Sequence, residues 1–259
     1  MQSSSARAQR VLARLGNRPS FWFIDPFGFS GLPLTLIGQI LSRPRSEVFI
    51  TFMSRDMNRF LDVRQHRKAS MSTLRLDDRQ FDQMIEAVLT SEKREFALRD
   101  VYVNQLKEVV GATYVWTARV ASRGADETIY YLVHASTHIK AYREMKDATY
   151  ELFGNRYAFL GREDYEVKSQ LELPLFETGS DALQRQLVQA FAGRTIIYQQ
   201  LTDAAYPDPR FHMFVDTHFR TAIAAMIAAG LVVKRARTTR KATAVSGDDV
   251  LIFPPRQAV

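Results

Sequence analysis

Residues 21–29 read FWFIDPFGF, an apolar run that stops abruptly in turn-forming residues. A short continuous apolar run bounded by turn signals predicts a buried β-strand. Pro26 has no backbone N–H for a ladder hydrogen bond, so strand pairing is expected to end near Asp25. The stretch therefore predicts a strand whose carboxyl end presents Asp25.

The segments that follow extend this strand into a βαβ unit. Leu34, Ile37 and Leu41 recur at helical spacing, and Pro33 suits a helix start. Residues 47–52, EVFITF, form a second buried-strand pattern. Strand, helix and strand within about 30 residues predict two parallel, neighbouring strands.

The middle of the chain alternates between helical and β patterns. Asp77 is a good cap for a helix with a clean apolar face, and a second helix is expected from about Phe96 to Gly111. Residues 114–121 and 128–135 are β-rich runs that predict a hairpin. A further helix is expected to end at Gly154.

The last part of the chain has a different pattern. Ser180 caps a helix that ends at Gly193, and a short helix and a long apolar helix follow, up to Gly230. Two short strand patterns, 231–233 and 250–253, flank a basic stretch. Three helices followed by a β-hairpin predict a winged-helix domain.

Composition limits the classes of function. The chain has 259 residues, a formal net charge of +7 and no cysteine. Disulfides, iron–sulfur clusters and Cys-ligated zinc are therefore excluded. No apolar run is long enough to span a bilayer, and the start lacks the apolar core of a signal peptide, so we expect a cytoplasmic protein without a membrane partner.

Positive charge is concentrated in one stretch. Residues 234–241 carry five basic side chains in eight positions, at the place where a wing is expected: Lys234, Arg235, Arg237, Arg240 and Lys241. Such a cluster predicts contact with nucleic acid, with DNA preferred, through phosphate groups. Any base preference is expected from exposed positions such as Arg210, His212 or Thr217. The alternative is a module that binds another protein and has a solvated hairpin.

The loop after the first strand carries the candidate catalytic residues. Methyltransferases that act on amines of nucleic-acid bases have an Asp-Pro-Pro-aromatic loop at the carboxyl end of a central strand, where it binds the amine and stacks on a flipped base. Asp25, Pro26 and Phe27 or Phe29 can supply such groups. The alternative is a simple strand end, with Asp25 as a turn former and the aromatics in the core.

The chain resembles the C-terminal part of the three-Cys-motif partner proteins, a bacterial family with a methyltransferase-like domain and a C-terminal winged helix. Four segments carry the resemblance: FIDPFG at 23–28, YYLVHASTH at 130–138, EMKDA at 144–148 and the closing pattern from Ala222-Ile to Gly230-Leu-Val. The resemblance implies a partial doubly wound α/β sheet, made of two parallel strands and an antiparallel hairpin. With the sequence patterns, we expect a tail at 1–20, disordered or basic, a methyltransferase-like half-domain at 21–160, a linker at 161–179 and a winged helix at 180–259.

One departure from the family concerns the methyl donor. The family binds S-adenosylmethionine through an upstream strand and Gly-rich turn, because the backbone must approach the cofactor closely. Gly16 is the only glycine among the residues before Phe21. We therefore expect this chain alone to bind S-adenosylmethionine weakly, and a complementing N-terminal half or protein partner to supply that site. Without it, the Asp25 strand would be an exposed edge. A non-catalytic DNA-binding or partner-binding subunit is the alternative function.

The remaining polar residues suggest no further chemistry. The histidines predict no metal site, and His134 is expected to pack within the sheet. Lys140, Arg143 and Lys146 are expected on a solvated helix face. Whether the chain is an enzyme stays open at this point.

Overall fold

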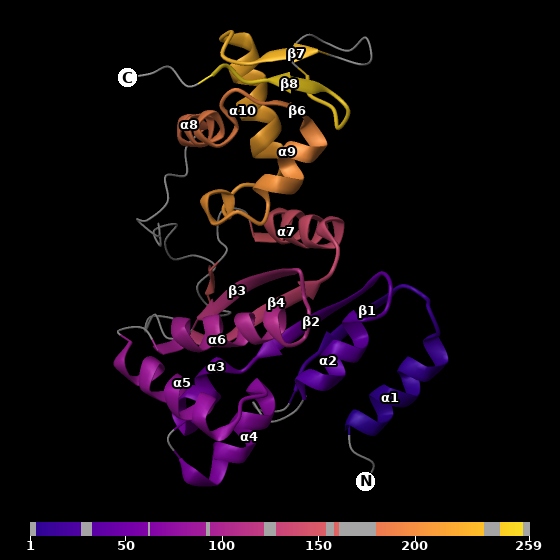
Figure 1. Cartoon of the computed structure of the whole chain (residues 1–259), viewed down its shortest axis with the longest axis vertical. Coiled ribbons are helices and arrows are strands. Elements are labelled where there is room, and N and C mark those ends of the chain that lie inside the picture. Colours follow the sequence, from indigo (N-terminus) through magenta and orange to yellow (C-terminus); the bar gives the residue numbers. More distant parts are fainter. Residues whose placement is uncertain are drawn as a thin grey trace. The chain divides into compact units, whose positions relative to one another are not determined.

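A computed structural model describes residues 4–26, 33–61, 63–91, 94–121, 128–153, 158–160, 180–235 and 244–255. The chain is an α/β protein with mixed sheets. It divides into two compact units, residues 1–169 and 170–259 (Figure 1). The division falls within the expected linker, 161–179, which lies outside the described residues.

The first unit is built on a sheet with helices on both faces. Its strands are β1 (Ser20–Ile24), β2 (Ser46–Phe52), β3 (Tyr114–Ala121), β4 (Thr128–Ser136) and β5 (Ala158–Leu160). Its helices are α1 (Ser4–Leu15), α2 (Leu34–Leu41), α3 (Ser54–Phe60), α4 (Arg64–Leu74), α5 (Asp78–Thr90), α6 (Arg94–Glu108) and α7 (Ile139–Phe153).

The strand order is β1-β2-β4-β3-β5. Strands β1 and β2 pair in parallel, with Trp22 opposite Val48. Strand β4 is antiparallel to both β2 and β3, so it lies reversed between them. The expected parallel pair and adjoining hairpin are thus confirmed, and β1 forms an edge among the described strands. The short strand β5, parallel to β3, was not predicted.

The main core lies on one face of this sheet. Val48, Ile50 and Phe52 of β2 and the facing residues of β4 pack against apolar side chains of α2 to α6. Helix α7 contacts the sheet at β3 and β4, where Tyr142 packs against Tyr114. Because the α2–α6 core and α7 contact opposite strand positions, they cover opposite faces, and Figure 1 shows α7 apart from the other helices of this unit.

The N-terminal residues differ from the expected disordered or basic tail. Residues Ser4–Leu15 form α1, in which Leu12 is only 5% exposed and belongs to the main core. The arginines of this segment favoured the prediction of a tail, although its apolar residues have the spacing of an amphipathic helix. Its single deeply buried leucine, aided by Ala8, attaches it to the unit.

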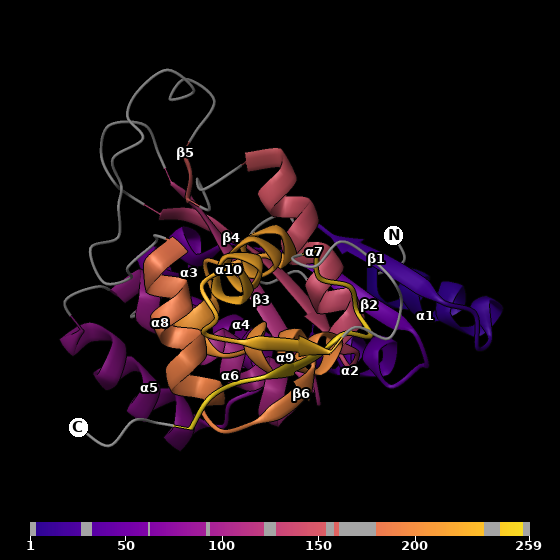
Figure 2. The same ribbon diagram turned by 90° about the horizontal axis from the view of Figure 1, so that it is seen from above.

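The second unit combines three helices with a small antiparallel sheet. In chain order it contains α8 (Ser180–Phe191), β6 (Thr195–Ile197), α9 (Tyr198–Ala205), the 3₁₀ turn η2 (Pro209–Phe211), α10 (Asp216–Ala228), β7 (Val233–Arg235) and β8 (Val250–Ile252). The sheet order is β6-β8-β7, and Figure 2 looks onto it. Phe219, Ile223 and Met226 of α10 are fully buried and form part of this unit's own core.

Candidate functional site

Asp25 lies directly after β1, at the carboxyl end of the parallel pair. Its side chain is exposed and Pro26 is half-buried, so the carboxylate is accessible to a ligand. Phe27 and Phe29 lie outside the described residues. Helix α2 begins after this loop and connects β1 to the parallel strand β2. The N-terminus of α2 therefore also lies at the carboxyl end of β1.

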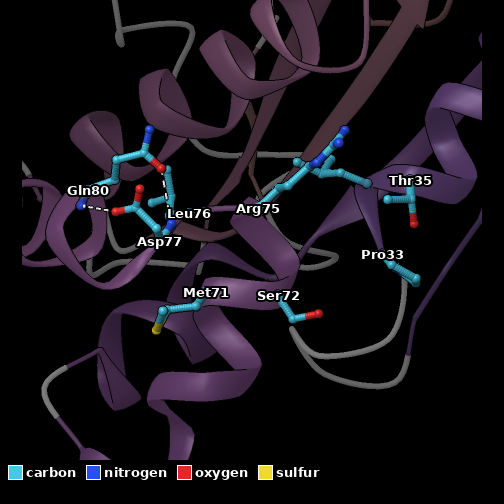
Figure 3. A pocket seen from close by; sticks show the side chains of 9 residues that line it. Pro33, Thr35, Met71, Ser72, Arg75, Leu76, Asp77 and Gln80 are labelled. Atoms are coloured by element: carbon cyan, nitrogen blue, oxygen red, sulfur yellow. Dashed lines mark hydrogen bonds between the residues drawn. The ribbon is translucent and has the colours of Figure 1, made fainter.

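A pocket of about 530 Å³ opens beside the start of α2. Its walls come from the start of α2, the end of α4 and the start of α5 (Figure 3). The lining residues are Pro33, Leu34, Thr35, Met71, Ser72, Arg75, Leu76, Asp77 and Gln80. The lining combines four apolar residues with five polar or charged ones.

The two charged groups of this pocket behave differently. Oδ1 of Asp77 accepts the backbone N–H of Gln80 at 2.8 Å, and the Gln80 side chain accepts the N–H of Asp77 at 3.0 Å. This capping box confirms Asp77 as the predicted cap. The guanidinium of Arg75 has no hydrogen-bond or ion-pair partner in the described part of the chain, whereas its backbone N–H donates to the carbonyl of Met71. Figure 3 shows Arg75 extending away from Asp77.

This pocket does not fit S-adenosylmethionine as the resemblance implies it would be held. The described residues that line it include no glycine, the residue that lets a backbone approach a cofactor closely. The Asp77 carboxylate already caps α5. No chemical step is therefore assigned through a methyl donor bound here.

A buried polar cluster lies beneath α7. His134 of β4 is fully buried, and its Nε2 lies 2.7 Å from Oε2 of Glu47 on β2. The prediction that His134 packs within the sheet is thus confirmed. The Nδ1 atom of His134 is buried without a hydrogen-bond partner in the described part of the chain.

Lys146 corrects the expectation of a wholly solvated face on α7. Lys140 is exposed and Arg143 is half-buried, but Lys146 is 0% exposed. Burial lowers the pKa of Lys146 to about 7, although nearby Asp147 opposes the shift. A buried lysine of this kind lies too deep to contact a phosphate at the surface.

The expected wing is described only in part. Arg235 is exposed on β7, whereas Arg237, Arg240 and Lys241 lie outside the described residues. Lys234 differs from the prediction, because its side chain is only 5% exposed and its Nζ lies 3.9 Å from Oδ2 of Asp249. The same ammonium donates to the carbonyl of Ala244 at 2.6 Å. Lys234 therefore links the two strands of the hairpin rather than extending toward a polyanion.

The predicted base-reading positions are unequal. Thr217 is exposed on α10. Arg210 makes an ion pair with Asp208 at 2.6 Å, which raises the pKa of Arg210 and lowers that of Asp208. His212 lies just after η2, with Nδ1 3.2 Å from the carbonyl of Pro209. Only Thr217 lies on the long helix itself.

Phe21 and Phe23 contradict the prediction of a buried strand. They are 55% and 62% exposed, while Trp22 and Ile24 face the core. Both rings stack on Phe49 of β2, with centroid separations of 6.3 Å and 6.0 Å. The expected exposed edge is present among the described strands, but a uniform apolar run does not show which of its side chains face away from the core.

The described residues contain neither a metal site nor a membrane-spanning helix. They contain no group of three or more His, Asp or Glu side chains placed to hold a metal ion. None of their helices combines the length and apolarity needed to cross a bilayer. Comparison with known proteins adds no relative, since no family model, curated protein or solved structure matches the chain.

Proposed function

We propose that the chain is a nucleic-acid-associated protein of methyltransferase-like ancestry whose C-terminal unit binds duplex DNA as a winged helix. The observation that carries the proposal is the element order α8-β6-α9-α10-β7-β8, closed by an antiparallel hairpin. In such a domain the third helix lies in the major groove and the hairpin contacts the phosphate backbone.

The charge distribution of the hairpin supports this proposal. Arg235 is exposed at the end of β7, and the basic residues Arg237, Arg240 and Lys241 follow directly in the chain. The ion pair between Lys234 and Asp249 holds the base of the hairpin. Basic residues in this part of the sequence suit phosphate contacts, which position a protein on DNA without reading its sequence.

The arrangement of the first unit supports the proposed ancestry. Asp25 follows a parallel strand pair, with the β3–β4 hairpin beside it, as the resemblance implies. Under this proposal methyl transfer to a nucleic-acid amine requires an assembly in which a complementing half or partner holds S-adenosylmethionine, and Asp25 accepts the hydrogen bond of the amine. A cytoplasmic location belongs to the same proposal.

The test is fluorescence anisotropy with labelled duplex DNA over a series of salt concentrations. The native chain should bind, and replacing Arg237, Arg240 and Lys241 with alanine should weaken binding similarly for unrelated sequences. The slope of log affinity against log salt should fall by about 0.9 for each phosphate that is no longer neutralised. Absence of salt-dependent binding at low ionic strength would refute the proposal.

A partner-binding module is the second candidate, and a separate observation favours it. Leu231, two residues before β7, and Val233, the first residue of β7, are 47% and 57% exposed. The cation of α10, Arg220, is engaged by Asp216 at 2.5 Å, and the exposed positions Thr221 and Ala225 are uncharged. Such a surface suits contact with another protein. If the native chain does not bind duplex DNA in the anisotropy test, the partner-binding module becomes the favoured function.

A further inference from the structure

The exposed face of β1 and β2 combines aromatic rings with free cations. Phe21 and Phe23 alternate along β1, so both side chains lie on the same face of the sheet. Both stack against Phe49, with interplanar angles of 26° and 30°. We call these three side chains the aromatic platform. Rings more than half exposed on a sheet face are costly in water unless a ligand covers them.

Two arginines lie at the amino end of the platform. The backbone N–H of Ser20 donates to the carbonyl of Arg45 at 3.2 Å, which places Arg45 beside the start of β1. Arg18 is two residues before Ser20. Both arginines are exposed, and in the described part of the chain neither guanidinium has a hydrogen-bond or ion-pair partner.

The acidic side chain on this face, Glu47, already contacts a buried histidine. Glu47 pairs with Ser136 and Phe21 in the strand registers, and its side chain is 29% exposed. Its Oε2 atom lies 2.7 Å from Nε2 of His134. The carboxylate is therefore directed toward the interior of the sheet, and its effect on an approaching phosphate is reduced. Asp25 lies at the opposite, carboxyl end of β1 from the arginines.

We propose that the aromatic platform, with Arg18 and Arg45, binds single-stranded nucleic acid. Bases stack on Phe21 and Phe23, and the phosphate groups contact the two guanidinium groups. Every base has a π-face, so an aromatic sheet surface bordered by cations holds single strands with little sequence preference. A duplex keeps its bases stacked on one another and offers no free face to the rings. This site goes beyond the duplex contact proposed for the C-terminal hairpin.

A polypeptide is the competing occupant of this face. An apolar edge strand pairs readily with another strand, including one from a second copy of the chain. The observations favour nucleic acid because the exposed side chains are aromatic, they stack on a neighbouring ring, and the two arginines stand at one end only. A second copy becomes an outcome of the test.

The experiment measures binding of fluorescein-labelled oligo-dT and of a labelled duplex by anisotropy. A variant with Phe21→Ala and Phe23→Ala should lose roughly 5- to 100-fold in affinity for oligo-dT for each ring, and keep its affinity for duplex. Phe21→Tyr with Phe23→Tyr should retain binding, because tyrosine also stacks. Leu152→Ala is the matched control, since Leu152 is 73% exposed in the same unit and lies at the end of α7.

Two further arms separate the sources of affinity. Arg18→Ala with Arg45→Ala should lower the salt slope for oligo-dT by about 0.7 for each phosphate that is no longer neutralised. The hairpin variant Arg237→Ala, Arg240→Ala, Lys241→Ala should retain oligo-dT binding, so this proposal and the duplex proposal fail independently. Unchanged oligo-dT affinity in the double Phe→Ala variant overturns the proposal. So does a native dimer in sedimentation that the same variant converts to a monomer.

Discussion

The hydroxyl of Tyr198 donates a hydrogen bond to Oδ1 of Asp216 at 2.8 Å, which joins the first residue of α9 to the first residue of α10. Nε of Arg220 lies 2.5 Å from the other oxygen of Asp216, and the Arg220 guanidinium covers the Tyr198 ring at 4.8 Å. Arg220 also donates to the carbonyl of Val245, just before β8. The cluster of Tyr198, Asp216 and Arg220 thus joins the two helices and contacts the segment that leads into β8.

Tyr198→Phe should destabilise the second unit alone. Asp216 keeps its arginine partner, so loss of one hydrogen bond should lower the free energy of unfolding by about 1 kcal/mol. Trp22 and Trp116 are the two tryptophans and both belong to the first unit. Urea unfolding followed by circular dichroism should therefore shift, while tryptophan fluorescence should not. Tyr130→Phe, whose hydroxyl has no hydrogen-bond partner in the described chain, is the control.

Lys146 should make the first unit more stable as pH rises. Its pKa is about 7 in the folded chain against an ordinary value of 10.5, so between these values the unfolded chain binds more protons. The free energy of unfolding then increases with pH across this window, and the cost of burying Lys146 is complete below it. Urea unfolding followed by tryptophan fluorescence at pH 7 and at higher pH measures the effect.

Lys146→Met is the matched variant, because methionine fills a similar volume without the charge. It should raise the free energy of unfolding at pH 7 by roughly 1–4 kcal/mol, with a benefit that shrinks as pH rises. Lys140→Met, at an exposed position of the same helix, should change neither quantity. A benefit of Lys146→Met that is constant with pH would contradict the assignment.

The sequence predicted those elements whose local signals were complete. Strands β1 and β2, the hairpin β3–β4 and helix α5 have clear apolar patterns, and Asp77 provides a capping box. Helix α4 was missed because its sequence, RQHRKASMSTL, is mostly polar and it ends at Arg75 in the left-handed region rather than at a glycine. Strand β6 has only three residues and was not predicted.

Side-chain positions were harder to predict than elements. On α7 the apolar side chain of Leu152 is 73% exposed, whereas Lys146 is buried. Tyr142, Lys146 and Thr149 share helical spacing, so the signal was present, but a lysine is normally counted as solvated. Exposure of Phe21 and Phe23 depends on which strand lies at the edge, and the order of strands is a tertiary property.

Replacing the neighbouring residues Lys234 and Arg235 should affect different properties, the first the stability of the second unit and the second its affinity for duplex DNA. Lys234→Ala removes the partner of the Asp249 carboxylate, whose side chain is only 4% exposed, and leaves a buried charge held by the backbone N–H of Ser246 at 2.8 Å. The second unit should lose roughly 2–4 kcal/mol of its free energy of unfolding. Arg235→Ala, at an exposed position, should leave stability unchanged and weaken duplex binding.

The two measurements must be made on both variants, because destabilisation alone can reduce binding. Circular dichroism with urea reports stability, and anisotropy with duplex DNA, well below the unfolding midpoint, reports affinity. Arg235→Lys keeps the positive charge and should restore most of the affinity that Arg235→Ala loses, since a phosphate contact depends mainly on charge. If Lys234→Ala leaves stability unchanged but lowers the salt slope, Lys234 contacts phosphate instead, and the hairpin must open further in solution than its ion pair with Asp249 allows.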